Sequence, residues 1–256
     1  MAQWKWVVER GRAGDRRDHA GDGKGGEEKG ESADEPSHRA GELGASDSDT
    51  RERAGDGGSG TGDRMEATLA VLAGGSSRRM GRPKALLPIG KGTLIEWVIE
   101  RLAPAFAEVL VTGGPSSPLP QALQPLLLLD EFTAAGPLAG IETALGAARH
   151  DRVLVVACDL PGATASLARR LVTLLERHDA VVPRLAGEPQ PTLATYHRRA
   201  RPVLRRRLRA GQLRVQEALT DLDVRWVDDA DPVAFLNCNA REDWLRARRL
   251  ASGHRP

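Results

Sequence analysis

One segment, 72–84, carries most of the residues in this chain that could bind a phosphate group. Its sequence, LAGGSSRRMGRPK, combines adjacent glycines, arginines and a final lysine. Glycines let a backbone approach a phosphate chain without a Cβ clash, and successive N–H groups in such a turn bind anions. Arginine and lysine add positive charge for the same ligand. The segment therefore predicts a loop that holds a nucleoside triphosphate, against the alternative of an ordinary Gly/Arg-rich surface loop.

Two common glycine-rich loops do not fit this segment. A P-loop requires a serine or threonine after its lysine, whereas Lys84 is followed by Ala85. A dinucleotide-binding fingerprint runs directly into a helix, and Pro83 and Pro88 disfavour a continuous helix here. The apolar run 67–72 that precedes the glycines is typical of a buried strand. A triphosphate loop of another kind remains the favoured interpretation.

A lone carboxylate, Asp159, stands at the end of the apolar run 153–157. Mg²⁺ prefers oxygen ligands and commonly takes one or two carboxylates together with substrate phosphates and water. We therefore expect Asp159 to bind a metal beside the phosphate loop, with capping of the following helix or turn as the alternative. The neighbouring Cys158 is expected to pack as a small apolar side chain, because no nearby group would lower its pKa.

Further polar side chains stand near two other turns. Asp130 precedes the GPLAG run at 136–140 and could accept hydrogen bonds from a guanine base or from a ribose hydroxyl. The sequence does not choose between these two ligands. Asn237 and Asn239 are two residues apart, which places them on one face of an extended segment. They could bind a polar heterocycle or a phosphate, or they could cap the last helix.

Apolar strands that alternate with helical stretches must position these residues. Strands are expected at 68–73, 108–112, 126–129, 152–157, 180–183 and 223–227. Helices are expected at 93–102, 137–148, 165–177, 197–209 and 240–250. This alternation predicts an α/β fold with a mostly parallel sheet and helices on both faces. Ligands bind such sheets at the carboxyl ends of the strands, where Gly74, Asp130 and Asp159 should gather.

Composition separates the chain into two parts. Between residues 11 and 64, 14 of 54 residues are glycine and Leu43 is the only large apolar side chain. Such a segment cannot bury enough apolar surface to fold, so 1–64 is expected to be a disordered leader. Met65 directly precedes the first predicted strand and is an alternative translation start. Residues 65–252 are expected to form a single domain.

Charge and cysteine content exclude several classes of protein. The net charge of +2 does not favour a nucleic-acid-binding protein. Two cysteines in different motifs argue against a disulfide framework or a zinc site. The sequence shows no membrane span and no export signal, so no membrane partner and a cytoplasmic location are expected.

An arginine-rich stretch near the predicted fourth helix has two interpretations, a solvated helix face or a surface that attracts an anionic substrate. Its arginines are Arg198, Arg199, Arg201, Arg205, Arg206, Arg207 and Arg209. None of the six histidines falls inside a motif. The lack of a histidine in any motif fits nucleotidyl transfer to a phosphate. A phosphate is already ionised, so it needs positioning and charge neutralisation rather than a general base.

The combination of motifs resembles the molybdenum cofactor guanylyltransferases, the MobA family of the nucleotidyltransferase superfamily. The matching runs are LAGGSSRRMGRPK at 72–84, GPLAG at 136–140, CD at 158–159, QPT at 190–192 and FLNCN at 235–239. The resemblance implies a Rossmann-like fold and a Mg²⁺ cofactor. It implies transfer of GMP from GTP to the terminal phosphate of Mo-molybdopterin, with release of pyrophosphate. Molybdoenzyme maturation proteins are candidate partners on the same ground.

The resemblance also implies roles for individual residues. Nucleotide binding falls to Leu72, Ala73, Gly74, Gly75, Lys84, Asp130 and Asp159. Catalysis falls to Arg79, Lys84 and Asp159, with Asp159 also the metal ligand. Asn237 and Asn239 match the pair associated with molybdopterin. Thr112 and Gln190 depart from the asparagine and histidine that the family often has at these positions.

Two alternatives to guanylyl transfer stay open at this point. One is a related enzyme, either a molybdenum cofactor cytidylyltransferase or another nucleotidyltransferase of the superfamily. The pair Gly74-Gly75 favours guanine, because the cytidine-using relatives more often have alanine-glycine there. The other alternative is a nucleotide-binding regulator without turnover, which the joint presence of Arg79, Lys84 and Asp159 disfavours.

Overall fold

The structure is a computed structural model that describes residues 64–74 and 83–253. The predicted leader therefore lies outside the described residues, apart from Arg64. Gly75 and Arg79, two residues of the predicted phosphate loop, also lie outside them.

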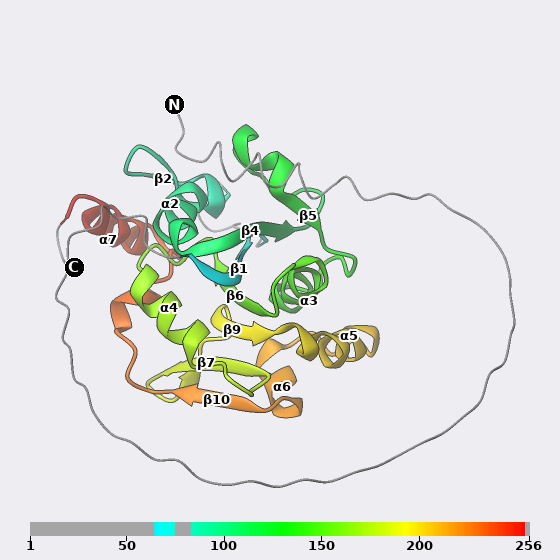
Figure 1. The fold of residues 1–256 in the computed structure, drawn as a ribbon. Helices are drawn as coiled ribbons and strands as arrows, with labels where there is room; N and C mark the ends of the chain where they lie inside the picture. Colours follow the sequence, from blue (N-terminus) through cyan, green and yellow to red (C-terminus); the bar gives the residue numbers. More distant parts are fainter. Residues whose placement is uncertain (1–63, 75–82, 254–256) are drawn as a thin grey trace, which may run out of the picture. The chain divides into compact units, whose positions relative to one another are not determined.

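The centre of the fold is a mostly parallel sheet, as the sequence predicted (Figure 1). Its strand order is β10-β7-β9-β6-β1-β4-β5, with the short β8 paired to β7. The strands are β1 (Met65–Leu72), β4 (Phe106–Gly113), β5 (Leu127–Leu129), β6 (Arg152–Ala157), β7 (Ala180–Leu185), β8 (Glu188–Pro189), β9 (Leu193–His197) and β10 (Val224–Val227). Only β9 among the seven strands of this order runs against the others, antiparallel to both β6 and β7. The carboxyl ends of β1, β4, β5 and β6 therefore lie on one edge.

Helices cover both faces of the sheet, and each face has its own apolar core. The helices are α2 (Leu94–Leu102), α3 (Pro137–Ala147), α4 (Ala165–Thr173), α5 (Arg201–Arg209), α6 (Val215–Ala218) and α7 (Arg241–Ala251). Side chains of α2 and α4 belong to one core, and those of α3, α5 and α6 to the other. Figure 1 shows α4 and α5 on either side of the β7–β9 region. The central strands are continuous apolar runs because both of their faces are buried.

The strand β9 corrects the sequence prediction, which placed no strand there and began a helix at His197. His197 ends β9, a 3₁₀ turn η4 (Arg198–Ala200) follows, and α5 begins at Arg201. The four residues 193–196 are all buried between β6 and β7. Pairing on both sides gives this short run its strand conformation. The predicted helix 165–177 is also shorter in the structure, since α4 ends at Thr173.

A third, smaller apolar cluster joins the residues after Lys84 to the C-terminal part of the chain. The turn η1 (Lys84–Leu86) leads into a hairpin of β2 (Pro88–Ile89) and β3 (Gly92–Thr93). Leu87 and Ile89 pack with Cys238 and with Ala247 of α7. The other 3₁₀ turns are η2 (Ala103–Ala105), η3 (Gln121–Leu126), η5 (Leu219–Asp221) and η6 (Pro232–Phe235). Among the described helices, none is both long and apolar enough to cross a membrane.

Candidate functional site

The predicted phosphate loop begins where β1 ends in the sheet. The Leu72 carbonyl accepts a hydrogen bond from Cys158 N at 3.1 Å, and Ala73 N donates to the Thr112 carbonyl at 2.8 Å. These two backbone groups therefore join β1 to its neighbours. Gly74 is exposed, and a Cβ built on it would meet no heavy atom within 4 Å among the described residues. The described residues therefore leave free space around Gly74.

Three predicted site residues meet at one point, although they are far apart in the sequence. The Lys84 Nζ lies 2.7 Å from Asp159 Oδ2 and donates to Asn239 Oδ1 at 2.5 Å. The Lys84 and Asp159 side chains retain 22% and 14% of their accessible surface. Both are therefore partly shielded from water yet within reach of a ligand. The arrangement joins one cation, one carboxylate and one amide at the carboxyl edge of the sheet.

Neither capping alternative describes Asp159 or Asn239. The helix after Asp159 is capped by Thr164, whose Oγ1 accepts a hydrogen bond from Leu167 N at 3.2 Å. At α7 the capping carboxylate is Asp243, which accepts hydrogen bonds from the backbone N of Asn239 and Ala240. The Asn239 side chain turns to Lys84 instead. Of the predicted amide pair, Asn237 lies exposed beside this contact, with its carbonyl accepting from Asn239 N.

Asp130 lies on the same edge but farther along it. It follows β5, and its backbone N donates to the Gly113 carbonyl at 3.0 Å. In the order β5-β4-β1-β6, three strand spacings separate β5 from the strand that leads to Asp159, roughly 14 Å. An extended nucleotide can span that distance along the ends of β1 and β4. Asp130 and the Lys84–Asp159 pair therefore lie along the same carboxyl edge of the sheet.

One oxygen of the Asp130 carboxylate is an acceptor that the described residues do not satisfy. This oxygen, Oδ1, is buried without a hydrogen-bond partner among them. Burial raises the pKa of Asp130, and the nearby Glu142 adds to the rise, while a hydrogen bond with the Thr143 side chain opposes it. A buried acceptor without a partner is costly. Donor groups on a ligand, such as those of a guanine base or a ribose, would remove that cost.

Comparison with known proteins decides the family. The family model described as "MobA-like NTP transferase domain" matches residues 69–224. The chain belongs to this family. A protein of Pelotomaculum thermopropionicum named "Probable molybdenum cofactor guanylyltransferase" is 36% identical over 199 residues, covering 75% of this chain and 96% of that protein.

Solved structures confirm the fold of this MobA-like chain. The molybdopterin-guanine dinucleotide biosynthesis protein A of Archaeoglobus fulgidus superposes with a TM-score of 0.63 at 27% identity, over 73% of this chain and 99% of that one. Rv0371C of Mycobacterium tuberculosis, solved as a complex with manganese, superposes with a TM-score of 0.52 at 20% identity, over 73% of this chain and 100% of that one. The predicted α/β fold with a mostly parallel sheet is confirmed.

Sequence reasoning missed one residue that builds the MobA-like site, Gly162. A Cβ built on Gly162 would lie 1.9 Å from the Val233 carbonyl oxygen. The missing side chain lets the segment 231–239 pack directly on the turn after Asp159. Cys238 N then donates to the Asp159 carbonyl at 3.0 Å, which brings Asn239 beside Lys84. The one sequence signal was the Pro161-Gly162 pair, which indicates a turn but not this contact.

Thr112 occupies the position where the family often has asparagine. Its side chain is buried, and its Oγ1 has no hydrogen-bond partner among the described residues. A Cβ on Gly140 would lie 2.9 Å from this oxygen, so Thr112 is covered by α3. The shorter side chain therefore stays beneath the helix rather than reaching the surface of the site.

Both cysteines are packed apolar side chains, as expected for Cys158. Burial, followed by the charge of Asp159, raises the pKa of Cys158 to about 12. The same causes raise the pKa of Cys238 to about 12. Neither thiol is therefore a nucleophile near neutral pH.

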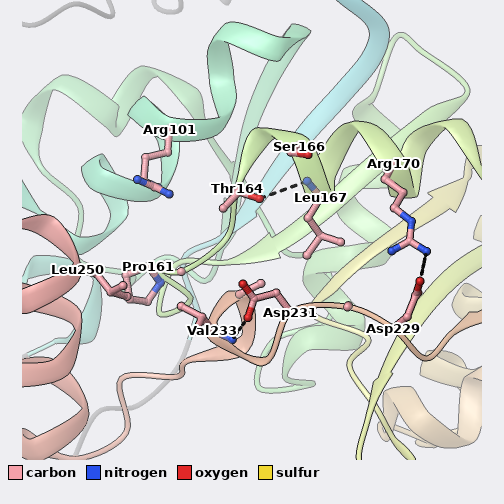
Figure 2. Close-up of a pocket in the computed structure, with 13 residues that line it drawn as sticks. Arg101, Pro161, Thr164, Ser166, Leu167, Arg170, Asp229, Asp231, Val233 and Leu250 are labelled. Atoms are coloured by element: carbon pink, nitrogen blue, oxygen red, sulfur yellow. Dashed lines mark hydrogen bonds and ion pairs between the residues drawn. The ribbon is translucent and has the colours of Figure 1, made fainter. Parts of the chain in front are cut away.

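A cavity of about 450 Å³ is lined by Pro161, Gly162 and Thr164 together with residues of other segments (Figure 2). The predicted site residues are not among the described residues that line it. Its two arginines are already engaged, since Arg170 binds both carboxylate oxygens of Asp229 and Arg101 Nε donates to the Ala163 carbonyl. This cavity is therefore lined by other residues than those that meet at Lys84 and Asp159.

Proposed function

We propose that this chain transfers GMP from GTP to the terminal phosphate of Mo-molybdopterin, forming Mo-molybdopterin guanine dinucleotide and releasing pyrophosphate. The observation that carries the proposal is the contact of Lys84 with both Asp159 and Asn239. This contact supports the proposal because Lys84, which we expect to bind phosphate, contacts both the carboxylate expected at the nucleotide and the amide expected at the acceptor. The name of the P. thermopropionicum relative supports the same reaction.

In the proposed reaction, an oxygen of the molybdopterin phosphate attacks the α-phosphorus of GTP. A new P–O bond forms as the bond between the α-phosphorus and the β-phosphate oxygen breaks, and pyrophosphate leaves. The attacking phosphate is already ionised, so the site needs no general base. Lys84 stabilises the negative charge that accumulates on the phosphates. Asp130 accepts hydrogen bonds from the guanosine.

The residues present fit a single divalent cation held by Asp159. The ion pair with Lys84 uses one of the two carboxylate oxygens of Asp159, and Mg²⁺ commonly takes few protein ligands beside a triphosphate. Among the described residues no cluster of three or more acidic, histidine or cysteine side chains offers a full metal cage. When bound, the cation would neutralise phosphate charge. Asp159 would hold it, and Lys84 would share the same phosphates.

The remaining predicted site residues complete the proposal, and two of them, Gly75 and Arg79, lie outside the described part of the chain. Arg79 is proposed to bind the triphosphate together with Lys84. The backbone at Gly74 and Gly75 is proposed to approach the phosphates, with Leu72 and Ala73 holding the start of the loop. Asn237 and Asn239 are proposed to contact molybdopterin.

The test is a pyrophosphate-release assay with GTP, CTP, ATP and UTP, each with and without molybdenum-loaded molybdopterin. We expect release only with GTP and only with the acceptor present. Preference for CTP would indicate the cytidylyltransferase instead. A different acceptor would indicate another nucleotidyltransferase, and binding of nucleotide without release would indicate a regulator.

Asp159→Ala is the matching variant, and it should abolish turnover while leaving the fold intact. Its control is Asp228→Ala, which removes an exposed carboxylate paired with Arg184 away from the site. Asp228→Ala should release pyrophosphate at the rate of the unmodified protein. Near-normal product formation by Asp159→Ala would contradict the assigned role of Asp159.

A further inference from the structure

Arg205 of α5 joins two segments that flank the nucleoside end of the site. Its guanidinium donates to Glu142 Oε1 of α3 at 2.8 Å. It also donates to both carboxylate oxygens of Glu131 at 2.7 Å, and Glu131 directly follows Asp130. Its Cζ lies 5.4 Å from the centre of the Phe132 ring. Arg205 therefore holds the loop that carries Asp130 against α3.

Glu142, the α3 residue that Arg205 contacts, is a buried carboxylate. The Glu142 side chain retains only 2% of its accessible surface, so its charge needs a partner inside the protein. Arg201 supplies a second cation, with Nε 2.9 Å from the same Glu142 oxygen. Room for Arg201 comes from Gly146, where a Cβ would lie 2.7 Å from the Arg201 Cζ. Two arginines of α5 thus balance one buried carboxylate of α3, and the arginine-rich helix is not only a solvated face.

The same carboxylate acts on Asp130. Glu142 is one of the charges that raise the pKa of Asp130, and Thr143, its neighbour on α3, hydrogen-bonds Asp130. Among the described residues, the charge that acts on Asp130 is that of Glu142 on α3. Glu131, next to Asp130, is acted on by Arg201, Arg205 and Arg209 of α5, and the first two of these arginines also pair with Glu142. Arg205 contacts both of these glutamates. It therefore acts on the position of Asp130 and on the charge around it.

We propose that Arg205 is a positioning residue for nucleotide binding, which it serves by fixing the Asp130 loop on α3 and by neutralising Glu142. The proposal rests on the proposed role of Asp130 in binding the guanosine. Arg205 does not touch the ligand in this scheme. Its effect is to keep the buried carboxylate oxygen of Asp130 aimed at the ligand and negatively charged.

The test compares GTP binding and turnover by the full chain and by Arg205→Met. Arg205→Met removes the contacts to Glu131 and Glu142 but leaves Glu142 its Arg201 partner, so the fold should survive. We expect the Kd and the KM for GTP to rise about tenfold, as expected for the loss of one well-aimed charge-assisted hydrogen bond. The kcat should change much less, because Lys84 and Asp159 are untouched.

The pH profile separates positioning from a general structural defect. Asp130 accepts hydrogen bonds best when ionised, so binding should weaken as the pH falls through its raised pKa. Removing the Arg205 cation leaves more negative charge around Asp130 and raises that pKa further. In a plot of GTP affinity against pH, the low-pH region where affinity falls is the acid limb. This acid limb should therefore move to higher pH in Arg205→Met. Arg205→Lys should restore the limb but only part of the affinity, because lysine keeps the charge and loses the forked geometry.

Two further variants serve as controls. Arg206→Met alters the next residue of the same helix, whose side chain is exposed and 4.0 Å from Asp221. It should leave both Kd and pH profile unchanged. Glu131→Gln keeps the Arg205–Glu142 contact but weakens the hold on the loop. It should raise the Kd without moving the acid limb upward.

The outcomes distinguish this proposal from the proposed function. If the unmodified protein forms the guanine dinucleotide while Arg205→Met keeps its Kd and its acid limb, the positioning role is wrong. An equal rise in Kd for Arg206→Met would also overturn it. If instead the unmodified protein releases no pyrophosphate with GTP and the acceptor, the proposed function fails. The positioning role of Arg205 is then tested by direct measurement of GTP binding. If the unmodified protein does not bind GTP, the positioning role is overturned as well.

Discussion

Gly162 offers the sharpest test of how the site is assembled. A Cβ at this position would lie 1.9 Å from the Val233 carbonyl oxygen, 2.9 Å from the Val233 carbonyl carbon and 3.3 Å from the Ala234 Cα. All three atoms are backbone, so no side-chain rotation can relieve the clash. In Gly162→Ala the whole segment that leads to Asn239 must move away from the Asp159 turn.

The size of this movement follows from the distances. Protein Cβ atoms essentially never approach another atom more closely than 3.0 Å, so the carbonyl must retreat by at least 1.1 Å from its 1.9 Å position. A shift of this size stretches the hydrogen bond from Cys238 N to the Asp159 carbonyl beyond a useful length. Overpacking costs about 1–3 kcal/mol and a lost hydrogen bond about 1 kcal/mol. The free energy of unfolding should therefore fall by about 2–4 kcal/mol.

Thermal unfolding measures the loss of stability in Gly162→Ala, and steady-state kinetics measure the effect of the displaced Asn239 on the KM values. For a folded part of this size the stability loss corresponds to a Tm lower by about 5–15 °C. Displacement of Asn239 should raise the KM for molybdopterin more than the KM for GTP, because Asp130 lies on the far side of the sheet centre. The control for the loss of stability is Gly114→Ala, whose Cβ would meet no heavy atom within 4 Å among the described residues. The reasoning is refuted if Gly162→Ala keeps the Tm and both KM values of the unmodified protein.

The remaining predictions concern the buried acid of β4 and the two thiols. Glu108 accepts hydrogen bonds from Thr68 Oγ1, Arg149 N and Arg149 Nε at 2.6–2.8 Å, so Glu108→Ala should lower the free energy of unfolding in urea by about 2–4 kcal/mol. The KM for GTP should not change, and exposed Glu66→Ala should leave both quantities unaltered. The raised pKa of Cys158 and Cys238 predicts that iodoacetamide at pH 8 labels them only after denaturation, which mass spectrometry can follow. Rapid labelling of the native protein would contradict their burial.

Much of the fold could be predicted from sequence because strands buried on both faces consist mainly of apolar residues. The central strands are covered by helices on both faces, so they stand out as continuous apolar runs. The apolar pattern of β9 is weaker, because only five residues separate Thr192 from the arginine-rich stretch. Its conformation depends on pairing with β6 and β7, which are distant in the sequence. Local pattern could not supply that information.

For the site as well, local sequence indicated single residues, whereas their contacts depend on segments that are distant in the sequence. Lys84 and Asp159 could be selected from their residue types and their places after apolar runs, and Asn239 from its spacing to Asn237. Their meeting at a single cation depends on strand order and on the route of the C-terminal segment. The Glu142–Arg205 pair could not be predicted, because a buried acid within a helix has no sequence pattern that distinguishes it from an exposed one.

The position of Lys84 is fixed from two sides by one small part of the fold. On one side, the hairpin that follows Lys84 packs with Cys238 and α7, and the Trp244 Nε1 donates to the Pro88 carbonyl at 2.9 Å. On the other side, Gly162 lets the segment before Cys238 lie directly on the Asp159 turn. Any movement of α7 would therefore move the hairpin and Asn239 together. The last helix therefore helps to position both the lysine and its amide partner.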